Sequence, residues 1–392
     1  MTPFTPVLPD YQGGSLVNLM ASVGGACGLK PGATLPYAPL SGLPASALSR
    51  CRNLVLLVVD GLGYTYLVEH SRGPLGRHLR SHLTSVFPST TASAVTTLMT
   101  GLPPAGHGLT GWHMWLEELQ AVTAILPLVP RSGGRFPGDP QALPGRLFDH
   151  PSFVSRLERT AYGLSPAAIA PSPFNRHHLA GGVQVPYQDL EDMLARVVTL
   201  AADPGPKYIY AYWPDLDATA HRHGVASPET LACFQAFETA FAAWLKVLEG
   251  SDTLVLVTAD HGFVDCPPER TLRLEDHPDL AHCLARPLCG ERRLPYCYLK
   301  PEAEERFCAY VNGPFAPYAQ AVSREKLLAE GWYGPGPVSP RLASRVGDYV
   351  LLMKDNWTLV DRVPGETPYT LVGVHGGVSP AEMLVPLVVA RA

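Results

Sequence analysis

Three stretches of the chain combine a continuous apolar run with an acidic end, and this combination restricts the possible folds most strongly. The runs are LVLLVVDG at 54–61, KYIYAYWPDLD at 207–217 and TLVLVTADHG at 253–262. Short apolar runs that are rich in β-branched side chains and stop at turn residues are typical of strands buried on both faces, as in a parallel sheet. A shorter run of the same kind, YTLVGVHGG at 369–377, ends near His375.

Amphipathic helices are predicted between these strands. Residues 189–201 and 228–249 both space their apolar side chains three and four positions apart, as on one face of a helix. The second segment also has boundary signals, with Ser227 as N-cap, Pro228 at the first position and Gly250 after the end. We therefore predict an α/β fold with a doubly wound, mostly parallel central sheet and helices on both faces.

Three other parts of the chain break this alternation. Residues 1–50 are rich in Pro, Gly and Ala and are predicted to wrap the surface. The segments at about 115–187 and 264–345 are rich in loops and are interpreted as insertions over the sheet edge, forming a smaller cap region. We expect one domain over residues 1–392 that carries these two insertions.

Composition restricts the partners and the compartment. Apolar residues make up 46% of the chain, and the net charge of −5 contains no long run of one sign. This predicts no nucleic-acid groove and no polybasic membrane anchor. No apolar run is predicted to span a membrane, and the N-terminus lacks a basic secretory region, so we expect a cytoplasmic protein. The eight cysteines form no CxxC pair. Reduced thiols are favoured, and disulfides among Cys283, Cys289, Cys297 and Cys308 are left open.

Potential metal ligands follow every predicted strand: Asp60, Asp215, Asp217, Asp260, His261 and His375. Ligands of open α/β sheets bind outside the carboxyl ends of the strands, so we expect these side chains to converge. Singly, an Asp after a strand is commonly a helix N-cap, and a lone His is commonly structural. Together, the carboxylates would repel one another unless divalent metal ions neutralised them.

The spacing within the second motif supports a metal site. Asp217 and His221 are four residues apart, which places both on one face of a helical turn. A ligand set of oxygen and nitrogen without sulfur suits zinc, manganese or similar ions.

Hydroxyl side chains cluster in SVFPSTTASAVTTLMTG at 85–101, where an apolar helix is predicted to begin and to stop at Gly101. A helix N-terminus offers free N–H groups and a positive dipole to an anion. A Thr hydroxyl such as that of Thr91 becomes a good nucleophile only when a metal or a base lowers its pKa. Without the neighbouring ligands, the cluster would be interpreted as an N-cap.

Taken in chain order, these motifs resemble the nucleotide pyrophosphatase/phosphodiesterase branch of the alkaline phosphatase superfamily. They are Asp60, FPSTT, PDLDATAHRHG, ADHG, and HGG followed by EMLVP. The resemblance spans roughly 54–108, 207–262 and 369–388 and leaves the insertions unmatched.

The resemblance implies a site for two metal ions, usually zinc, with manganese as the alternative. One ion would be held by Asp60, Thr91, Asp260 and His261, and the other by Asp217, His221 and His375. Thr91 would attack phosphorus, and hydrolysis of phosphodiester or nucleotide pyrophosphate bonds would pass through a covalent phosphothreonine.

Three positions depart from the family pattern. Ala94 stands where the family often carries an Asn that hydrogen-bonds a phosphoryl oxygen, which leaves that oxygen to backbone N–H groups or to an inserted residue. Ala220 replaces the usual Gly before the metal-binding His. Asp215 is an additional carboxylate, and the four-residue spacing to His221 assigns the ligand role to Asp217.

The expected substrate is a small phosphate ester or a nucleotide. No Arg adjoins Thr91, which favours diesters because they carry less negative charge than monoesters. A phosphomonoesterase or a phosphonate hydrolase on the same two-metal site is the alternative, since Arg131, Arg176, Arg292 or Arg293 could reach it. A non-catalytic metal-binding protein is less favoured because the ligand set is intact. We interpret His107 as structural, and the His177–His178 pair as solvated loop residues.

Overall fold

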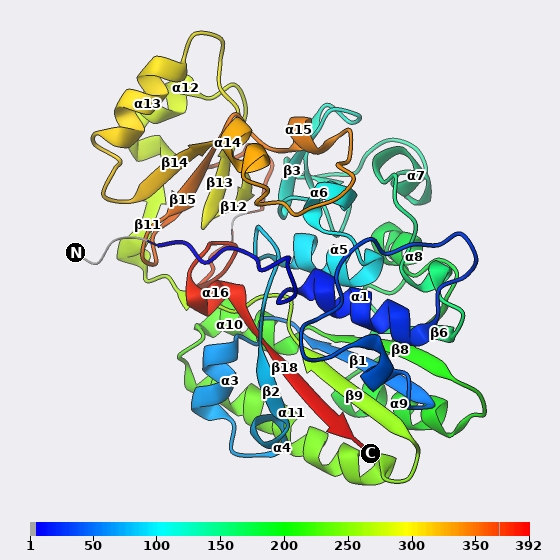
Figure 1. Cartoon of the computed structure of the whole chain (residues 1–392). Helices are drawn as coiled ribbons and strands as arrows, with labels where there is room; N and C mark the ends of the chain where they lie inside the picture. Colours follow the sequence, from blue (N-terminus) through cyan, green and yellow to red (C-terminus); the bar gives the residue numbers. More distant parts are fainter. Residues whose placement is uncertain (1–4, 368) are drawn as a thin grey trace.

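The structure is a computed structural model that describes residues 5–367 and 369–392 (Figure 1). Its centre is a seven-stranded sheet in the order β2-β18-β9-β1-β8-β6-β7. These strands are β1 (Asn53–Val59), β2 (Leu79–Thr84), β6 (Thr160–Pro166), β7 (Val183–Tyr187), β8 (Lys207–Trp213), β9 (Thr253–Thr258) and β18 (Leu384–Arg391). The five strands from β9 to β7 are parallel, and only β18 runs antiparallel to its neighbours. The predicted α/β fold class with a mostly parallel central sheet is confirmed.

The three apolar runs form the middle of this sheet. Every residue of β1 and β9 is buried, as expected for strands covered on both faces. Val58 lies opposite Tyr212 of β8 and Thr258 of β9, so the three strands end at the same edge. The residues that follow them are therefore brought together in space.

Helices cover both faces of the sheet (Figure 1). On one side lie α1 (Leu16–Cys27) and α5 (Thr91–Thr100), and on the other α9 (Leu190–Ala202) and α11 (Pro228–Leu248). The predicted boundaries hold, because the side chains of Asp189 and Ser227 accept hydrogen bonds from the first turns of α9 and α11. Gly101 ends α5 in a left-handed conformation with φ of 67°.

The first predicted insertion is too long. Residues 160–187 are not part of a cap, because β6 and β7 extend the central sheet beyond β8. The apolar signal there is weak, since β7 lies at the sheet edge and its burial is only partial. The prediction for the N-terminal segment is also wrong in part: all but one residue of α1 are buried, and this helix packs against α5 rather than along the surface.

The remaining inserted residues join into a second seven-stranded sheet, above the first in Figure 1. Its order is β14-β15-β13-β12-β3-β4-β5. The first insertion, with the two residues before it, supplies β3 (His113–Leu116), β4 (Ala121–Ala124) and β5 (Val129–Pro130). The second insertion supplies β12 (Cys289–Glu291), β13 (Leu294–Cys297) and β14 (Ala319–Ser323). The last strand, β15 (Tyr349–Met353), comes just after the second insertion. The single pairing of Gly290 with His113 joins the two halves of this cap sheet.

The run at 369–377 does not form a strand of the central sheet. Only β17 (Gly373–Val374) is extended, and it pairs with β10 (Val264–Asp265) in a small separate ribbon. The last strand of the central sheet is instead β18, which lies between β9 and β2. His375 still reaches the edge of the central sheet, where its ring stacks on that of His261, which follows β9.

The shorter elements connect these layers. They are α2 (Ala45–Leu48), α3 (Tyr64–His70), α4 (Pro74–Arg77), α6 (Pro104–His107), α7 (Pro144–Leu147), α8 (Pro173–His178), α10 (Asp215–His223), α12 (Pro278–Cys283), α13 (Glu304–Asn312), α14 (Arg324–Ala329), α15 (Leu342–Arg345), α16 (Pro380–Met383), β11 (Thr271–Arg273) and β16 (Thr358–Val360).

Helix α11 is long and apolar enough to cross a membrane by length and composition alone, which the sequence analysis did not identify. The buried apolar side chains of this helix pack on the central sheet and on α9. Phe237 stacks on Trp213 of β8 with ring centroids 4.7 Å apart, and Trp244 donates a hydrogen bond to the Leu194 carbonyl. All eight cysteines are free thiols in the structure.

Candidate active site

Asp60 lies at the carboxyl end of β1 and is almost fully buried, at 1% exposure. Its backbone N–H donates to the Trp213 carbonyl, which fixes the turn against the end of β8. The Tyr212 hydroxyl donates a short hydrogen bond to one carboxylate oxygen, Oδ2. The other oxygen, Oδ1, is buried and has no hydrogen-bond partner among the described residues. An unpartnered carboxylate oxygen in this position is suited to a metal ion.

The second carboxylate comes from the end of β9. Asp260 Oδ1 accepts hydrogen bonds from the backbone N–H groups of Gly61 and His261, at 3.1 and 3.0 Å, while its Oδ2 is buried and unpartnered in the described part of the chain. His261 Nδ1 lies 3.1 Å from the Gly262 carbonyl, so this nitrogen carries the proton and Nε2 presents a lone pair. That Nε2 lies 3.4 Å from both Asp60 Oδ1 and Asp260 Oδ2.

Thr91 is the first residue of α5 and is 7% exposed. Its hydroxyl oxygen lies 3.1 Å from His261 Nε2, beside the two unpartnered carboxylate oxygens. Thr90 precedes it as the N-cap in an extended conformation, which directs the start of the helix toward the site. The first N–H groups of a helix have no intrahelical partner, so they are available to an anion bound next to Thr91.

Asp217, His221 and His375 form a second group. Both Asp217 and His221 lie on α10, and their atoms Oδ1 and Nε2 are 3.3 Å apart. His375 Nε2 lies 3.3 Å from His221 Nε2 and 3.9 Å from Asp217 Oδ1. His221 Nδ1 contacts the Gly373 carbonyl at 2.9 Å, which fixes its tautomer as in His261. The buried Asp217 Oδ1 has no hydrogen-bond partner among the described residues.

The two groups adjoin. The rings of His261 and His375 stack with centroids 3.6 Å apart. One ligand atom each from Asp217, His261 and His375 also lies within 4.8 Å of the others. The structure therefore brings all seven predicted site residues, from five separate parts of the chain, into one continuous cluster.

The electrostatics of the cluster favour cations. Burial, reinforced by repulsion between the carboxylates, raises the pKa of Asp60 and Asp217 well above the usual Asp value. Burial also lowers the pKa of His221 to about 4 and that of His375 well below its usual value, so these imidazoles are neutral near neutral pH. Neutral imidazoles beside crowded carboxylates form a donor set that divalent ions complete.

Two residues near the site were missed by sequence reasoning. Glu291, at the end of β12 in the cap sheet, accepts hydrogen bonds at Oε1 from the Thr90 hydroxyl at 2.6 Å and from the Trp112 backbone N–H at 2.7 Å. It therefore ties the cap to the start of α5. Tyr212, which binds Asp60, was also missed. Its position three residues before Asp215 in the strand was a usable signal, whereas Glu291 lies in an insertion with no recognisable motif.

Of the four arginines considered for substrate binding, two are engaged elsewhere. Arg131 forms ion pairs with Asp361 and Glu366. Arg293 is 1% exposed and forms a buried ion pair with Glu382 at 3.0 Å. Arg292 follows Glu291, and its charge acts on His221 and Glu291. Its guanidinium stacks over Tyr369 and donates a hydrogen bond to the Tyr369 carbonyl at 3.0 Å. Among the described residues, no hydrogen bond or ion pair places Arg176 at the site.

The departures from the family pattern are accommodated by packing. Ala94 is fully buried and belongs to the main apolar core, so it offers no group to a substrate. Ala220 is buried as well, with its carbonyl close to Gly373. His107 is structural as predicted: its Nε2 contacts the Thr97 hydroxyl at 3.1 Å and its Nδ1 accepts from the Leu109 N–H.

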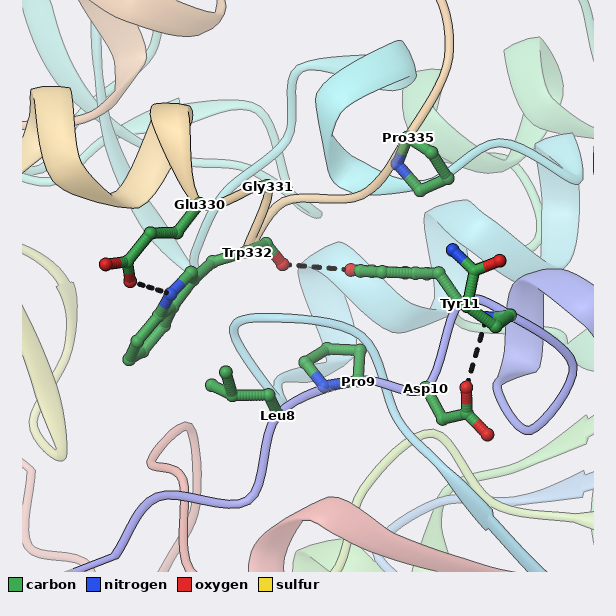
Figure 2. A pocket seen from close by; sticks show the side chains of 9 residues that line it. Leu8, Pro9, Asp10, Tyr11, Glu330, Gly331, Trp332 and Pro335 are labelled. Atoms are coloured by element: carbon green, nitrogen blue, oxygen red, sulfur yellow. Dashed lines mark hydrogen bonds between the residues drawn. The ribbon is translucent and has the colours of Figure 1, made fainter.

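A cavity of about 300 Å³ lies apart from this cluster, where the N-terminal segment meets residues 330–335 (Figure 2). Figure 2 shows the Tyr11 hydroxyl directed toward the Trp332 carbonyl, and the hydrogen bond between them is 3.1 Å long. None of the seven site residues lines this cavity.

The whole arrangement matches a known family. The model of the type I phosphodiesterase/nucleotide pyrophosphatase family matches residues 54–377. The chain belongs to this family. Its members' reaction class, phosphoester hydrolysis, agrees with a cluster of buried carboxylates, imidazoles and a hydroxyl at the carboxyl edge of the sheet.

Solved structures share the fold. Murine ectonucleotide pyrophosphatase/phosphodiesterase 5, solved as an inactive threonine-to-alanine variant in complex with AMP, is 17% identical with a TM-score of 0.64, over 85% of this chain and 87% of that chain. Phosphonoacetate hydrolase from Sinorhizobium meliloti, in complex with phosphonoformate, is 18% identical with a TM-score of 0.61, over 87% of this chain and 90% of that chain. At these identities, the likeness establishes the fold alone.

Proposed function

We propose that the chain hydrolyses phosphodiester or nucleotide pyrophosphate bonds, with Thr91 as nucleophile and two divalent ions as cofactors. The observation that carries this proposal is the position of the Thr91 hydroxyl, 3.1 Å from His261 Nε2 and next to two buried, unpartnered carboxylate oxygens. A hydroxyl at a helix N-terminus, beside a donor set that a cation completes, is suited to attack on phosphorus.

The donor atoms divide into two sets. Asp60, Thr91, Asp260 and His261 would hold one ion, and Asp217, His221 and His375 would hold the other. Bound metal ions lower the pKa of an attacking hydroxyl or water and stabilise the charge that develops on phosphoryl oxygens. Zinc suits the nitrogen and oxygen donors best, with manganese as the alternative.

The chain's own residues supply the positioning. The N-terminus of α5 directs its free N–H groups at a phosphoryl oxygen, the role that Ala94 cannot perform. The attack of Thr91 Oγ1 forms a bond to phosphorus as the leaving-group oxygen departs, which gives a phosphothreonine. Water then releases the phosphoryl group and regenerates the Thr91 hydroxyl. An inactive threonine-to-alanine variant of murine ectonucleotide pyrophosphatase/phosphodiesterase 5 is consistent with this role.

The ester class follows from the charges near the site. No Arg belongs to the buried cluster in the part of the chain that the structure describes, and the charge of the inserted Arg292 acts on His221 and on Glu291 beside the cluster. A diester carries less negative charge than a monoester and needs less compensation, so we propose a diester or a nucleotide as the substrate.

The test is hydrolysis of bis-p-nitrophenyl phosphate and p-nitrophenyl phosphate by chelator-stripped protein, with zinc or manganese added back. The proposal predicts metal-dependent turnover with preference for the diester. Preference for the monoester would leave the site in place but change the substrate class. The absence of turnover with every metal would overturn the proposal and favour a non-catalytic metal-binding protein.

A phosphonate substrate is the second candidate, because a structural neighbour is a phosphonoacetate hydrolase. Arg292 would pair with the extra carboxylate that such a substrate carries. Release of phosphate from phosphonoacetate, compared between the native chain and an Arg292→Ala variant, separates this candidate from the diester proposal.

A further inference from the structure

Three histidines converge at a second place, and none belongs to the candidate active site. His150 lies between α7 and β6, and His177 and His178 end α8. One ring nitrogen of each lies within 4.8 Å of the other two. The Nε2 atoms of His150 and His178 are 3.0 Å apart. The interpretation of His177 and His178 as solvated loop residues is therefore wrong: both lie on a helix, His178 is fully buried and His177 is partly buried.

Backbone carbonyls hold two of the rings in the tautomer that a metal requires. His178 Nδ1 lies 2.9 Å from the Phe174 carbonyl, so Nδ1 carries the proton and Nε2 faces His150 with a lone pair. His177 Nε2 lies 3.3 Å from the His150 carbonyl, so Nε2 carries the proton and Nδ1 keeps the lone pair that can bind a metal. A ligating imidazole almost always donates its other N–H in this way.

The rings are also held rigidly in an apolar setting. Phe148 contacts all three, with centroid distances of 5.7 Å to His150, 5.2 Å to His177 and 5.1 Å to His178. Phe174 packs on His178 at 4.1 Å. Burial lowers the pKa of each of the three imidazoles, which keeps them in the neutral form that binds metal without losing a proton.

We propose that His150, His177 and His178 bind a third divalent ion, zinc, separate from the ions of the proposed active site. Tetrahedral zinc with Zn–N distances of about 2.0–2.1 Å places its nitrogen ligands about 3.3 Å apart. The Nε2 atoms of His150 and His178 are already 3.0 Å apart, and a ring nitrogen of His177 lies within 4.8 Å of both rings. Three imidazoles without a carboxylate select zinc over magnesium, calcium or manganese. His177 is only partly buried, so solvent reaches the triad on this side.

The charges around this triad permit a cation. The positive charges of Arg156 and Arg345 lower the pKa of His150, although less than burial does, and would also repel a bound cation. Arg345 is paired with Glu118 at 3.1 Å, which compensates much of its charge. Asp149, which is adjacent to His150, forms an ion pair with Arg341. Arg176 directly precedes His177 on α8 and is exposed, so solvent screens its charge.

The position of the triad suggests a stabilising role. The His150 segment is anchored to α5 by a hydrogen bond from the Phe153 N–H to the Met99 carbonyl, 2.7 Å long. Helix α8 also packs against α5. An ion that joins His150 to α8 would therefore clamp two segments around the far end of the helix that begins at Thr91.

The test is the zinc content of the full-length chain after equilibration with zinc and removal of loosely bound metal. His177→Gln is the first variant because this side chain is the most exposed of the three, and His150→Gln is the second. His282→Gln is the matched control, since His282 is exposed and its side chain lies outside the triad. Circular dichroism of each protein without metal shows whether the variant is folded.

The proposal predicts that each triad variant holds one zinc fewer than the native chain, while His282→Gln holds the same number. The zinc-dependent rise in melting temperature should shrink in the same variants. Equal zinc content in the native chain and both folded triad variants would overturn the proposal and leave a hydrogen-bonded histidine pair. The test compares the zinc content of each triad variant with that of the native chain. The expected difference of one ion is therefore the same even if the proposed active site binds fewer ions than expected.

Discussion

At the scale of single residues, Thr91 carries the strongest chemical prediction. Thr91→Ala should lower kcat for the diester by about 10³-fold or more, because the nucleophile is lost. Thr91→Ser should keep a measurable fraction of the activity, since it retains a hydroxyl at the same position. Metal content should change little in either variant, because the imidazole and carboxylate ligands remain. Steady-state kinetics and metal analysis check this, and full activity of the alanine variant would eliminate Thr91 as the nucleophile.

Glu291 is predicted to act as a positioning residue. Glu291→Ala removes the acceptor for the Thr90 hydroxyl and the Trp112 N–H. Leaving such groups unpaired costs about 1–3 kcal/mol, so the melting temperature should fall. kcat should fall as well, since the N-cap next to Thr91 is released. Glu291→Gln keeps an acceptor oxygen and should recover most of both losses; equal effects of the two substitutions would contradict this role.

The convergence of the strand-end residues was predictable, because parallel strands that end at one edge of a sheet bring the residues after them together. Asp60, Asp260 and His261 needed only the strand-end rule, and Asp217 with His221 needed helical spacing. Glu291 carried no such signal, since only the tertiary pairing of β12 with β3 brings it to Thr90. His150 and His178 were missed for the same reason: they are 28 residues apart in sequence but in contact in space.

At the scale of secondary-structure elements, the loop after β9 depends on a glycine. A Cβ on Gly262 would lie 2.0 Å from the Ala381 carbonyl oxygen and 2.8 Å from the Gly63 Cα, both of which are backbone atoms. Gly262→Ala should therefore displace the adjacent His261 and lower zinc affinity, with a stability loss of about 1–3 kcal/mol. Gly145→Ala is the control, because open space surrounds a Cβ there. Zinc titration and thermal melting of both variants measure the difference.

The elements themselves were predicted where the pattern was strong. The fully buried strands β1 and β9, and the amphipathic helices α9 and α11, each carry a clear periodicity. The edge strand β7 is only partly buried, so its residues are mixed and were taken for an insertion. Helix α1 was missed because its residues are buried almost all round, and a helix of this kind lacks the polar stripe on which the prediction depends.

At the scale of the whole molecule, a buried ion pair connects Arg293, in the turn between β12 and β13 of the cap sheet, to Glu382 on α16, just before β18 of the central sheet. Burial acts to raise the pKa of Glu382, but the charge of Arg293 and the hydrogen bonds from Gly377 and Ser379 outweigh it and hold the pKa below its usual value. The ionised Glu382 therefore stabilises the fold at pH values above the pKa of Glu in the unfolded chain. This stabilisation is lost as pH falls through the lower pKa of Glu382 in the folded protein. Arg293→Met should destabilise the fold by about 3–5 kcal/mol, measured by urea unfolding. A loss below about 1 kcal/mol would show that the pair is dispensable.

The last prediction concerns metal and pH together. Burial and mutual repulsion raise the pKa of Asp60 and Asp217 in the metal-free protein. The pKa of an Asp in the unfolded chain is about 3.9, so above this pH the folded apo protein binds more protons than the unfolded chain. As pH rises further, these two carboxylates increasingly destabilise the folded apo protein. Zinc requires the ionised carboxylates and reverses the effect. The rise in melting temperature on adding zinc to chelator-stripped protein should therefore grow between about pH 5 and about pH 8. A rise that stays constant, or shrinks, would show that these two carboxylates do not release protons to the metal.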